Sequence, residues 1–144
     1  MGIQNFNLMV DCPSMNTYLP FLQKLSREAL QHLEEDVQTK ICFAVNEGLI
    51  NALRYSDDEA NMTFAINKNN DYIEFIIKNY GEEISNLVLE DITSRSFDDI
   101  LWEENGRGFL IINEIIDEWS FCRDEKGRNV LNMKMNMTGE KIYV

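Results

Sequence analysis

The sequence predicts a two-layer α/β sandwich in which helices cover one face of a mixed, mostly antiparallel sheet. The chain has 144 residues, a common size for one domain. Hydrophobic residues make up 44% of it, enough to build a core without disulfides or a structural metal. The apolar spacing changes along the chain between helical and strand-like patterns, and no repeat or linker interrupts it. We therefore expect residues 1–144 to form a single domain.

A short strand and two helices are predicted for the first part of the chain. Residues 6–10 alternate loosely between apolar and polar, as strands do. The turn and cap residues Pro13-Ser14 precede the first helix, expected over about 16–33, where apolar side chains recur at helical spacing. The acidic pair Glu34-Glu35 then begins a second helix that runs to about Tyr55.

The rest of the chain predicts two hairpins, with a connector and a helix between them. The expected elements are strands near 61–66 and 72–77, a helix at 106–116, and strands at 118–123 and 129–137. The turn Asn69-Asn70-Asp71 suits the first hairpin. Between the hairpins, residues 82–105 carry only scattered apolar side chains among acids. We interpret them as a partly ordered connector that acts as a lid over a ligand.

The composition argues against several classes of function. Thirteen basic and 25 acidic residues give a net charge of −12, which disfavours binding to nucleic acid. No apolar run is long enough to span a membrane and the N-terminus lacks the features of a signal peptide, so we expect a cytoplasmic protein. The three cysteines, Cys12, Cys42 and Cys122, lack the spacing of a zinc site. We interpret all three as small buried apolar residues.

The predicted second helix carries the most informative residues. At about 100° per residue, Glu47, Asn51 and Arg54 share a face at the edge of the helix's apolar stripe. An asparagine supplies a hard oxygen ligand for Mg²⁺, and a glutamate one turn earlier can orient or deprotonate a nucleophile. The alternative is an amphipathic helix with polar residues at its boundary. Gly48 favours a site, because glycine inside a helix costs about 1 kcal/mol and suggests close packing.

Two glycine turns are candidates for the rest of a site. Gly106-Arg107-Gly108 precedes an apolar helix, where free backbone amides bind anions and Arg107 could hold a phosphate. Asn79 ends a predicted strand two residues before Gly81, in a position to recognise the edge of a ligand. Either turn can also be an ordinary loop. The glycine pattern is neither a P-loop nor a dinucleotide fingerprint.

Together and in this order, these motifs resemble the ATP-binding (Bergerat) fold of gyrase, heat-shock chaperones and histidine kinases. Within that superfamily the chain is most similar to the small bacterial anti-sigma-factor serine kinases. Residues 47–52 match that family's Glu-Ala-x-x-Asn-Ala box, and residues 106–111 match its second glycine box. The resemblance covers nearly the whole chain, including the closing hairpin.

The resemblance implies that ATP and Mg²⁺ bind between the sheet, the helices and a mobile lid. In that arrangement Glu47 would be the general base and Asn51 the Mg²⁺ ligand. Residues 106–108 would cradle the phosphates, and Arg54 would flank them.

The chain departs from the family's pattern at two places in the implied pocket. Its first glycine box, usually Asp-x-Gly-x-Gly, reads Asn79-Tyr80-Gly81-Glu82-Glu83. The amide oxygen of Asn79 can still accept a hydrogen bond from the adenine amino group, but as a neutral acceptor. Glu83 replaces a glycine near the phosphates, where its charge could repel them. Asn129 takes the place of a threonine, and its amide could donate to the ligand.

The resemblance implies a regulatory protein serine kinase that works by partner switching. Such a protein sequesters a sigma factor and phosphorylates a serine on its antagonist, and relatives commonly form homodimers. The alternative is a nucleotide-independent interaction module with a degenerate pocket. Glu47 and Asn51 favour the enzyme, whereas Asn79 and Glu83 favour the module. The detached ATP-binding half of a histidine kinase is less favoured, because no phosphoacceptor helix pair is expected before the domain.

Overall fold

The structure, a computed structural model, describes residues 5–82 and 107–137. The elements in these ranges are β1 (Phe6–Pro13), a 3-10 helix (Asn16–Tyr18), α1 (Leu19–Ala29), α2 (Glu35–Arg54), β2 (Asn61–Lys68), β3 (Tyr72–Asn79), α5 (Arg107–Ile115), β4 (Glu118–Arg123) and β5 (Asn129–Asn136). The predicted connector and lid, apart from Glu82, lies outside the described residues. So do Glu83 and Gly106.

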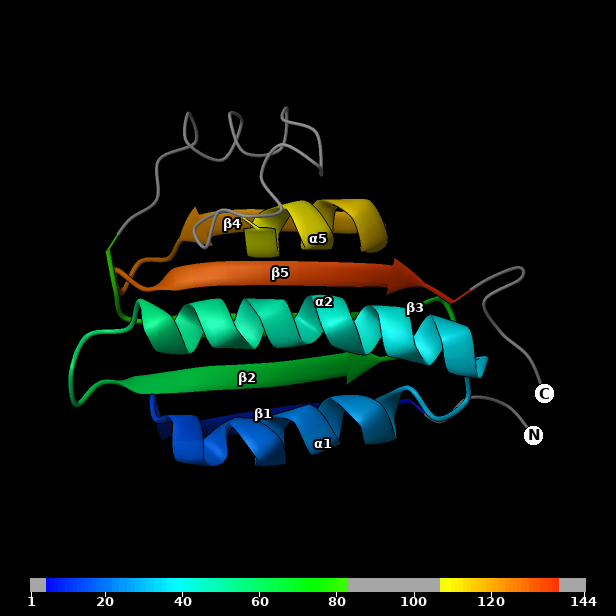
Figure 1. The fold of residues 1–144 in the computed structure, drawn as a ribbon, viewed down its shortest axis with the longest axis horizontal. Helices are drawn as coiled ribbons and strands as arrows, with labels where there is room; N and C mark the ends of the chain where they lie inside the picture. Colours follow the sequence, from blue (N-terminus) through cyan, green and yellow to red (C-terminus); the bar gives the residue numbers. More distant parts are fainter. Residues whose placement is uncertain (1–4, 83–106, 138–144) are drawn as a thin grey trace.

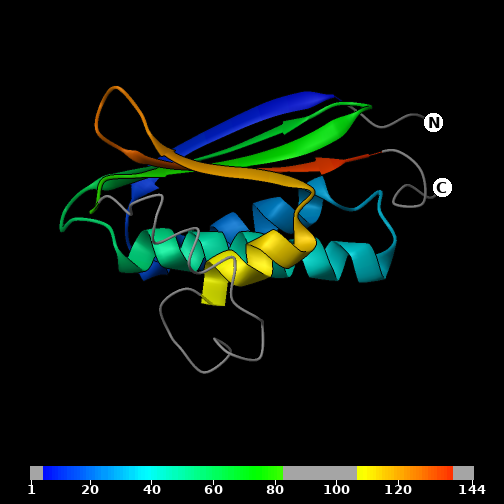
Figure 2. The same cartoon turned by 90° about the horizontal axis from the view of Figure 1, so that it is seen from above.

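The five strands form one sheet in the order β1-β2-β3-β5-β4, and every neighbouring pair is antiparallel. The helices α1, α2 and α5 all lie on one face of this sheet (Figures 1 and 2). The predicted two-layer α/β sandwich is therefore confirmed. The described sheet is antiparallel throughout rather than mixed. The last strand, β5, lies between β3 and β4. The hairpin of β4 and β5 therefore joins the sheet through the pairing of β5 with β3.

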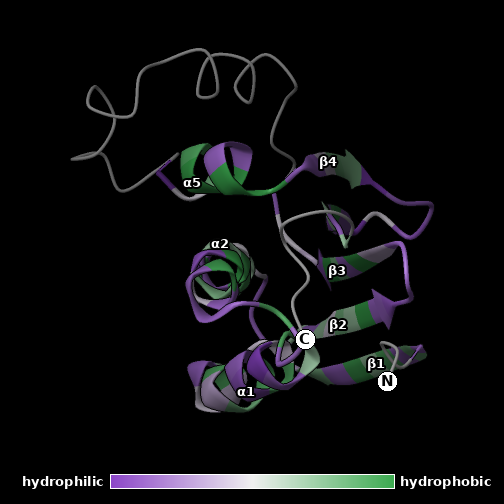
Figure 3. Cartoon of the chain, turned by 90° about the vertical axis from the view of Figure 1, so that its right-hand side faces the viewer, coloured by the Kyte–Doolittle hydropathy of each residue, from purple (hydrophilic) through white to green (hydrophobic). Residues whose placement is uncertain are grey.

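Strand alternation places the core between the two layers, and hydrophobic residues occur in both (Figure 3). In β3 the side chains that face the helices belong to Ile73, Phe75, Ile77 and Asn79, and in β5 to Asn129, Leu131, Met133 and Met135. Each row is apolar except at one end. That end carries an asparagine in both strands, and the two asparagines are partners in the β3–β5 register.

The first helix ends earlier than the sequence predicts. We expected one helix over 16–33, but α1 ends at Ala29 after a separate 3-10 turn. Side chains from other elements donate hydrogen bonds to backbone carbonyls at the end of α1 and in the turn that follows it. Gln38 donates from Nε2 to the carbonyl of Leu33 at 2.6 Å, and Lys68 donates to that of Ala29. A helix end satisfied in this way does not need a further turn.

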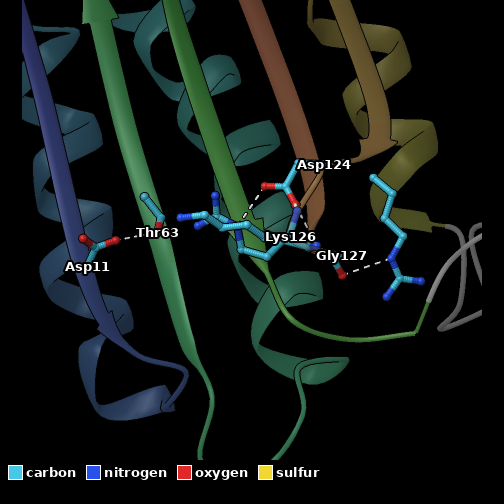
Figure 4. Close-up of polar contacts among 7 residues, drawn as sticks. Asp11, Thr63, Asp124, Lys126 and Gly127 are labelled. Carbon is cyan, nitrogen blue, oxygen red and sulfur yellow. Dashed lines mark hydrogen bonds and ion pairs between the residues drawn. The ribbon is translucent and has the colours of Figure 1, made fainter.

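One of the three cysteines contradicts the prediction that all are buried. Cys12 is buried and Cys42 is half-buried, but Cys122 is exposed. Cys122 lies on β4, an edge strand, and alternates with residues that face the helices. It therefore points to the opposite face of the sheet, which no described helix covers. On that face the hydroxyl of Thr63 donates to Asp11 across β1 and β2 (Figure 4).

No helix within residues 5–82 and 107–137 is long and apolar enough to cross a membrane. The longest, α2, has 20 residues. It carries charged residues at both ends and half-buried polar residues along its length. It packs in the helical layer between α1 and α5 (Figure 1).

Lys68 is a buried lysine that joins the sheet to the end of α1. Only 4% of the residue is exposed, and its Nζ donates to the carbonyl oxygen of Ala29 at 2.6 Å. That carbonyl lacks a partner inside the helix, and the partial negative charge at a helix C-terminus attracts a cation. Burial lowers the pKa of Lys68, because desolvation disfavours the charged ammonium.

We expect Lys68→Met to lower the free energy of unfolding by about 1–3 kcal/mol at neutral pH, because the Ala29 carbonyl loses its donor. The pKa of Lys68 is lower in the folded than in the unfolded state, so the unfolded chain binds more protons between the two values. The stability of wild type relative to Lys68→Met should therefore rise with pH in that window.

Urea unfolding at pH 7 to 10 measures both effects. Lys40→Met, at an exposed position of α2, is the control and should show neither. A difference between wild type and Lys68→Met that shrinks as the pH rises would contradict the account.

Candidate functional site

A small cavity lies where α2, α5 and the ends of β3 and β5 meet. Its volume is about 30 Å³, and its lining includes Gly48, Asn51, Asn79, Glu82, Phe121 and Asn129. This volume holds a water molecule or two, whereas typical ligand pockets begin at about 300 Å³. Three asparagine side chains from three different elements therefore meet around one small space.

Gly48 allows α2 to lie close against the sheet. A Cβ at this position would be 2.9 Å from Cδ2 of Leu131 and 3.1 Å from Cδ1 of Ile77. The sequence correctly indicated close packing at Gly48. The groups that pack there are core side chains of β3 and β5. This contact fixes how close α2, and with it Asn51, lies to the sheet.

Asn51 contacts the start of α5. A Cβ on Gly108 would lie 2.5 Å from Nδ2 of Asn51 and 3.5 Å from its Oδ1. Only a glycine leaves room for the amide here, and the nitrogen of the amide is the atom nearer to α5. The predicted helix motif and the predicted glycine turn, far apart in the sequence, are thus in direct contact.

Asn79 is 5% exposed and donates towards the end of α2. Its Nδ2 lies 3.3 Å from Oγ of Ser56 and 3.5 Å from the carbonyl oxygen of Ala52. The hydroxyl of Ser56 itself donates to that same Ala52 carbonyl. A polar chain therefore links the end of β3 to the last turn of α2.

Asn129, the partner of Asn79 in the β3–β5 register, is only 3% exposed. Its Nδ2 donates to the backbone carbonyl oxygen of Glu82 at 2.8 Å. Its Oδ1 is buried and accepts no hydrogen bond within the described parts of the chain. The sequence led us to expect that this amide donates to a ligand. One of the two N–H groups of this amide is already used by Glu82, and the oxygen has no donor among the described residues.

Gly81 allows the chain leaving β3 to pass close to the end of α2. A Cβ on Gly81 would overlap the carbonyl oxygen of Tyr55. The carbonyl of Gly81 accepts a hydrogen bond of 2.8 Å from the guanidinium of Arg123. Sequence reasoning missed Arg123, although its position marks it: it follows Trp119 and Phe121 on the inward face of a predicted strand.

The turn between β4 and β5 is held by Asp124 (Figure 4). Its carboxylate accepts hydrogen bonds from the backbone amides of Lys126 and Arg128 and from Nε of Arg128. The bond from the Arg128 amide, together with that residue's guanidinium, holds the pKa of Asp124 below its ordinary value. Arg123 donates from Nε to the carbonyl of Gly127 at 3.0 Å. This turn therefore positions both Arg123 and the start of β5.

Aromatic residues that the sequence reasoning did not single out form one wall of the site. Phe109 of α5 packs edge-on against Phe121 of β4, with ring centroids 5.3 Å apart, and against Trp119 at 5.8 Å. Nε1 of Trp119 donates to Oδ1 of Asn113 at 3.0 Å. The inward alternation of the predicted strand 118–123 could have identified Phe121, which lines the cavity.

The remaining predicted residues do not line the cavity. Glu47 is half-buried on α2, one turn before Asn51. Arg54 and Arg107 are exposed at the end of α2 and the start of α5. No group of three or more metal-binding His, Cys, Asp or Glu side chains occurs in residues 5–82 and 107–137. An Mg²⁺ ion at Asn51 would rest on few protein ligands, as Mg²⁺ bound to phosphates usually does.

A model of the histidine kinase-like ATPase domain matches residues 12–135 of the chain. The matched region includes α2 with Glu47 and Asn51, both halves of the sheet, and α5. A comparison with curated proteins found no match.

We expect the contact between Gly108 and Asn51 to be detectable as an energetic coupling. Gly108→Ala should lower the free energy of unfolding by about 1–3 kcal/mol through overpacking. The higher helix propensity of alanine should offset at most about 1 kcal/mol of this loss. In an Asn51→Ala background the atom that the new Cβ meets is gone. The cost should then fall by about 1 kcal/mol or more.

Denaturant unfolding of the two single variants and the double variant measures this coupling. Gly127→Ala is the control: its φ of 79° strains any other residue, but no atom lies within 4 Å of the added Cβ. Its cost should add to that of Asn51→Ala without coupling. If the cost of Gly108→Ala were also simply additive with that of Asn51→Ala, α2 and α5 would not meet at Asn51 and Gly108.

Proposed function

Because the chain belongs to the histidine kinase-like ATPase domain family, we propose that it binds ATP at the cavity between α2, α5 and the ends of β3 and β5. One observation carries this proposal. Asn51, Asn79 and Asn129 line a single cavity, and Asn51 touches the glycine at the start of α5. Convergence of a few polar groups on an otherwise apolar pocket is typical of small-molecule sites.

The two ends of the cavity suit different parts of a nucleotide. At one end, α5 begins at Arg107, so that its first backbone amides lack partners within the helix and favour an anion. Asn51 lies beside these amides, and its Oδ1 is the atom turned further from Gly108. We assign this end to the phosphates and the bound Mg²⁺. The other end, with the buried Asn79 and Asn129, is then left for the base.

A nucleotide requires the cavity to widen. Its volume of about 30 Å³ is roughly a tenth of that of a small ligand pocket. Two of the lining residues, Tyr55 and Glu82, are exposed, so their side chains can move without opening the core. Phe121 is only half-buried. Widening at these residues leaves Gly48 and the packed rows of β3 and β5 in place.

Within the family, we propose the activity of an anti-sigma-factor-like serine kinase that acts by partner switching. The support is the resemblance of residues 47–52 and 106–111 to that family's boxes. Glu47 lies one turn from Asn51 on α2, where side chains are about 5–6 Å apart at Cβ. In this proposal it would accept the proton of a serine hydroxyl beside the phosphates. ATP would supply the phosphoryl group and Mg²⁺ would neutralise charge developing on it. Positioning is the protein's main contribution.

The partners in this proposal are a sigma factor and its antagonist, and the chain would act as a homodimer. The acidic surface, with a net charge of −12, suits protein partners with basic patches. A nucleic acid or a membrane is not part of the proposal.

The narrow cavity favours a second candidate, a nucleotide-independent interaction module. In that case the asparagines are remnants of a pocket that has closed, and regulation depends on binding alone. Direct nucleotide binding separates the two candidates.

We expect saturating Mg-ATP to stabilise the folded protein. At about 100 times the dissociation constant the gain is roughly 2.7 kcal/mol, visible as a raised melting temperature. Asn51→Ala should lose the Mg²⁺-dependent part of the affinity. Asn46→Ala, on the same helix but outside the cavity lining, should keep it. An unmoved melting temperature, with no heat in calorimetry, would favour the interaction module.

We expect Glu47→Gln to separate binding from chemistry. The substitution keeps the shape of the side chain but removes the proton acceptor, so ATP affinity should change little. Phosphoryl transfer to the cognate antagonist should fall by about 10²- to 10⁴-fold. Glu35→Gln, exposed in the first turn of the same helix, is the matched control and should transfer at the wild-type rate. Wild-type transfer by Glu47→Gln would remove Glu47 from the reaction.

A further inference from the structure

The segment that follows β3, residues 80–82, contributes Glu82 to the wall of the cavity. The ladder between β3 and β5 ends just before this segment, at the pair of Asn79 and Asn129. The ladder therefore does not fix this part of the wall. How far the wall can move depends on the contacts that residues 80–82 make on either side.

On one side the segment is fixed to the loop that follows α2. The backbone amide of Asp57 donates to the carbonyl oxygen of Tyr80 at 2.7 Å, and Ser56 and Gly81 form an isolated antiparallel bridge. Gly81 also lies so close to the carbonyl of Tyr55 that a Cβ would overlap it. These contacts involve backbone atoms alone. The segment and the end of α2 therefore form one unit.

On the other side two side chains of the hairpin of β4 and β5 hold the segment. Nη2 of Arg123, the last residue of β4, donates to the carbonyl oxygen of Gly81 at 2.8 Å. Nδ2 of Asn129 donates to the carbonyl oxygen of Glu82 at the same distance. Arg123 is the register partner of Asn129, so the two bonds start from neighbouring positions. Together they join the segment to the hairpin at the end of the cavity.

Of these two side chains, Arg123 is the one that can release its bond at the lower cost. Asn129 is only 3% exposed, so its amide would lose a partner in a buried place. Arg123 is exposed, and water can replace the carbonyl of Gly81 as its acceptor. Its Nε donates to the carbonyl of Gly127 at 3.0 Å, a contact within its own hairpin that does not depend on Gly81.

We propose that Arg123 is a latch on the nucleotide cavity: its bond to Gly81 keeps the cavity narrow and slows the entry of the ligand. This inference rests on the proposed nucleotide binding. Two other walls are fixed, by the close packing at Gly48 and by the β3–β5 ladder. Widening therefore separates the hairpin from residues 80–82, and the bond between Arg123 and Gly81 breaks. Arg123 is a positioning residue that acts through Gly81.

A latch and an arginine that binds phosphates respond to substitution in opposite ways. Arg123→Met removes the bond that resists widening. The association rate of Mg-ATP should then rise about two- to tenfold, with an unchanged dissociation rate, and the dissociation constant should fall by the same factor. Loss of an arginine that contacts the bound phosphates would instead raise the dissociation rate and weaken binding.

Stopped-flow mixing with ATP that carries a fluorescent N-methylanthraniloyl group on the ribose measures both rates, and calorimetry with unlabelled Mg-ATP gives the dissociation constant. Lys126→Met is the matched control, because Lys126 is exposed in the same hairpin and its loss changes the net charge equally. It measures the effect of charge alone and should not raise the association rate.

Arg123→Lys tests the bond separately from the charge. It keeps the charge and a single donor nitrogen, so its association rate should lie between those of the wild type and Arg123→Met. Should Arg123→Met not fold, Arg123→Lys is compared with the wild type alone and should still bind faster.

The outcomes separate this inference from the proposed function. An association rate that Arg123→Met leaves unchanged or lowers, or a dissociation constant that it raises, would overturn the latch and leave nucleotide binding in place. If the wild-type chain binds no nucleotide, the proposed function fails, and the latch fails with it.

Discussion

The pairing of β5 with β3 joins the two described parts of the chain. Residues 5–82 supply β1, α1, α2, β2 and β3, and residues 107–137 supply α5, β4 and β5. Eight paired positions, from Tyr72–Asn136 to Asn79–Asn129, hold these parts together as one sheet. The contact of α5 with α2 follows from this pairing, because the hairpin of β4 and β5 places α5 beside α2 over the same face (Figure 1). Every residue of the candidate site depends on this arrangement.

At the candidate site the chain carries residues that are unfavourable for core packing. The apolar rows of β3 and β5 each end in a buried asparagine, α2 contains a glycine on its buried side, and the buried Oδ1 of Asn129 has no donor among the described residues. Each departure costs stability by itself. They occur together, around one cavity. Such clustering is expected where selection for binding competes with selection for packing.

Periodicity predicted most elements of the described fold, although the first helix ends earlier than expected. The alternation in β3 and β5 and the helical stripe of α2 are local patterns, and each appears in the structure near its expected bounds. The sheet order could not be predicted this way, because nothing in the local sequence says that β5 pairs with β3. The exposure of Cys122 has the same origin, since it depends on which strand forms the edge.

The site was only partly predictable for a similar reason. Asn51, Asn79, Asn129 and Gly108 belong to recognisable motifs, and the structure brings them together. Arg123 and Phe121 belong to no motif: Arg123 binds the backbone of Gly81, which is distant in sequence, and Phe121 packs against Phe109 of α5. The use of the Asn129 nitrogen by Glu82 was likewise invisible, because a sequence does not state which end of an amide is already occupied.

The position of β4 at the edge of the sheet has a consequence for ligand entry. This strand carries Phe121 in the cavity wall, yet it is paired on one side only. Fraying there breaks one ladder, whereas displacing β3 would break two. For the nucleotide that we propose, the opening that breaks the fewest hydrogen bonds is thus a local one at this edge, with the centre of the sheet intact. The observed affinity would then be the intrinsic one multiplied by the fraction of molecules whose edge is open, so a substitution that stiffens β4 could weaken binding without touching the ligand.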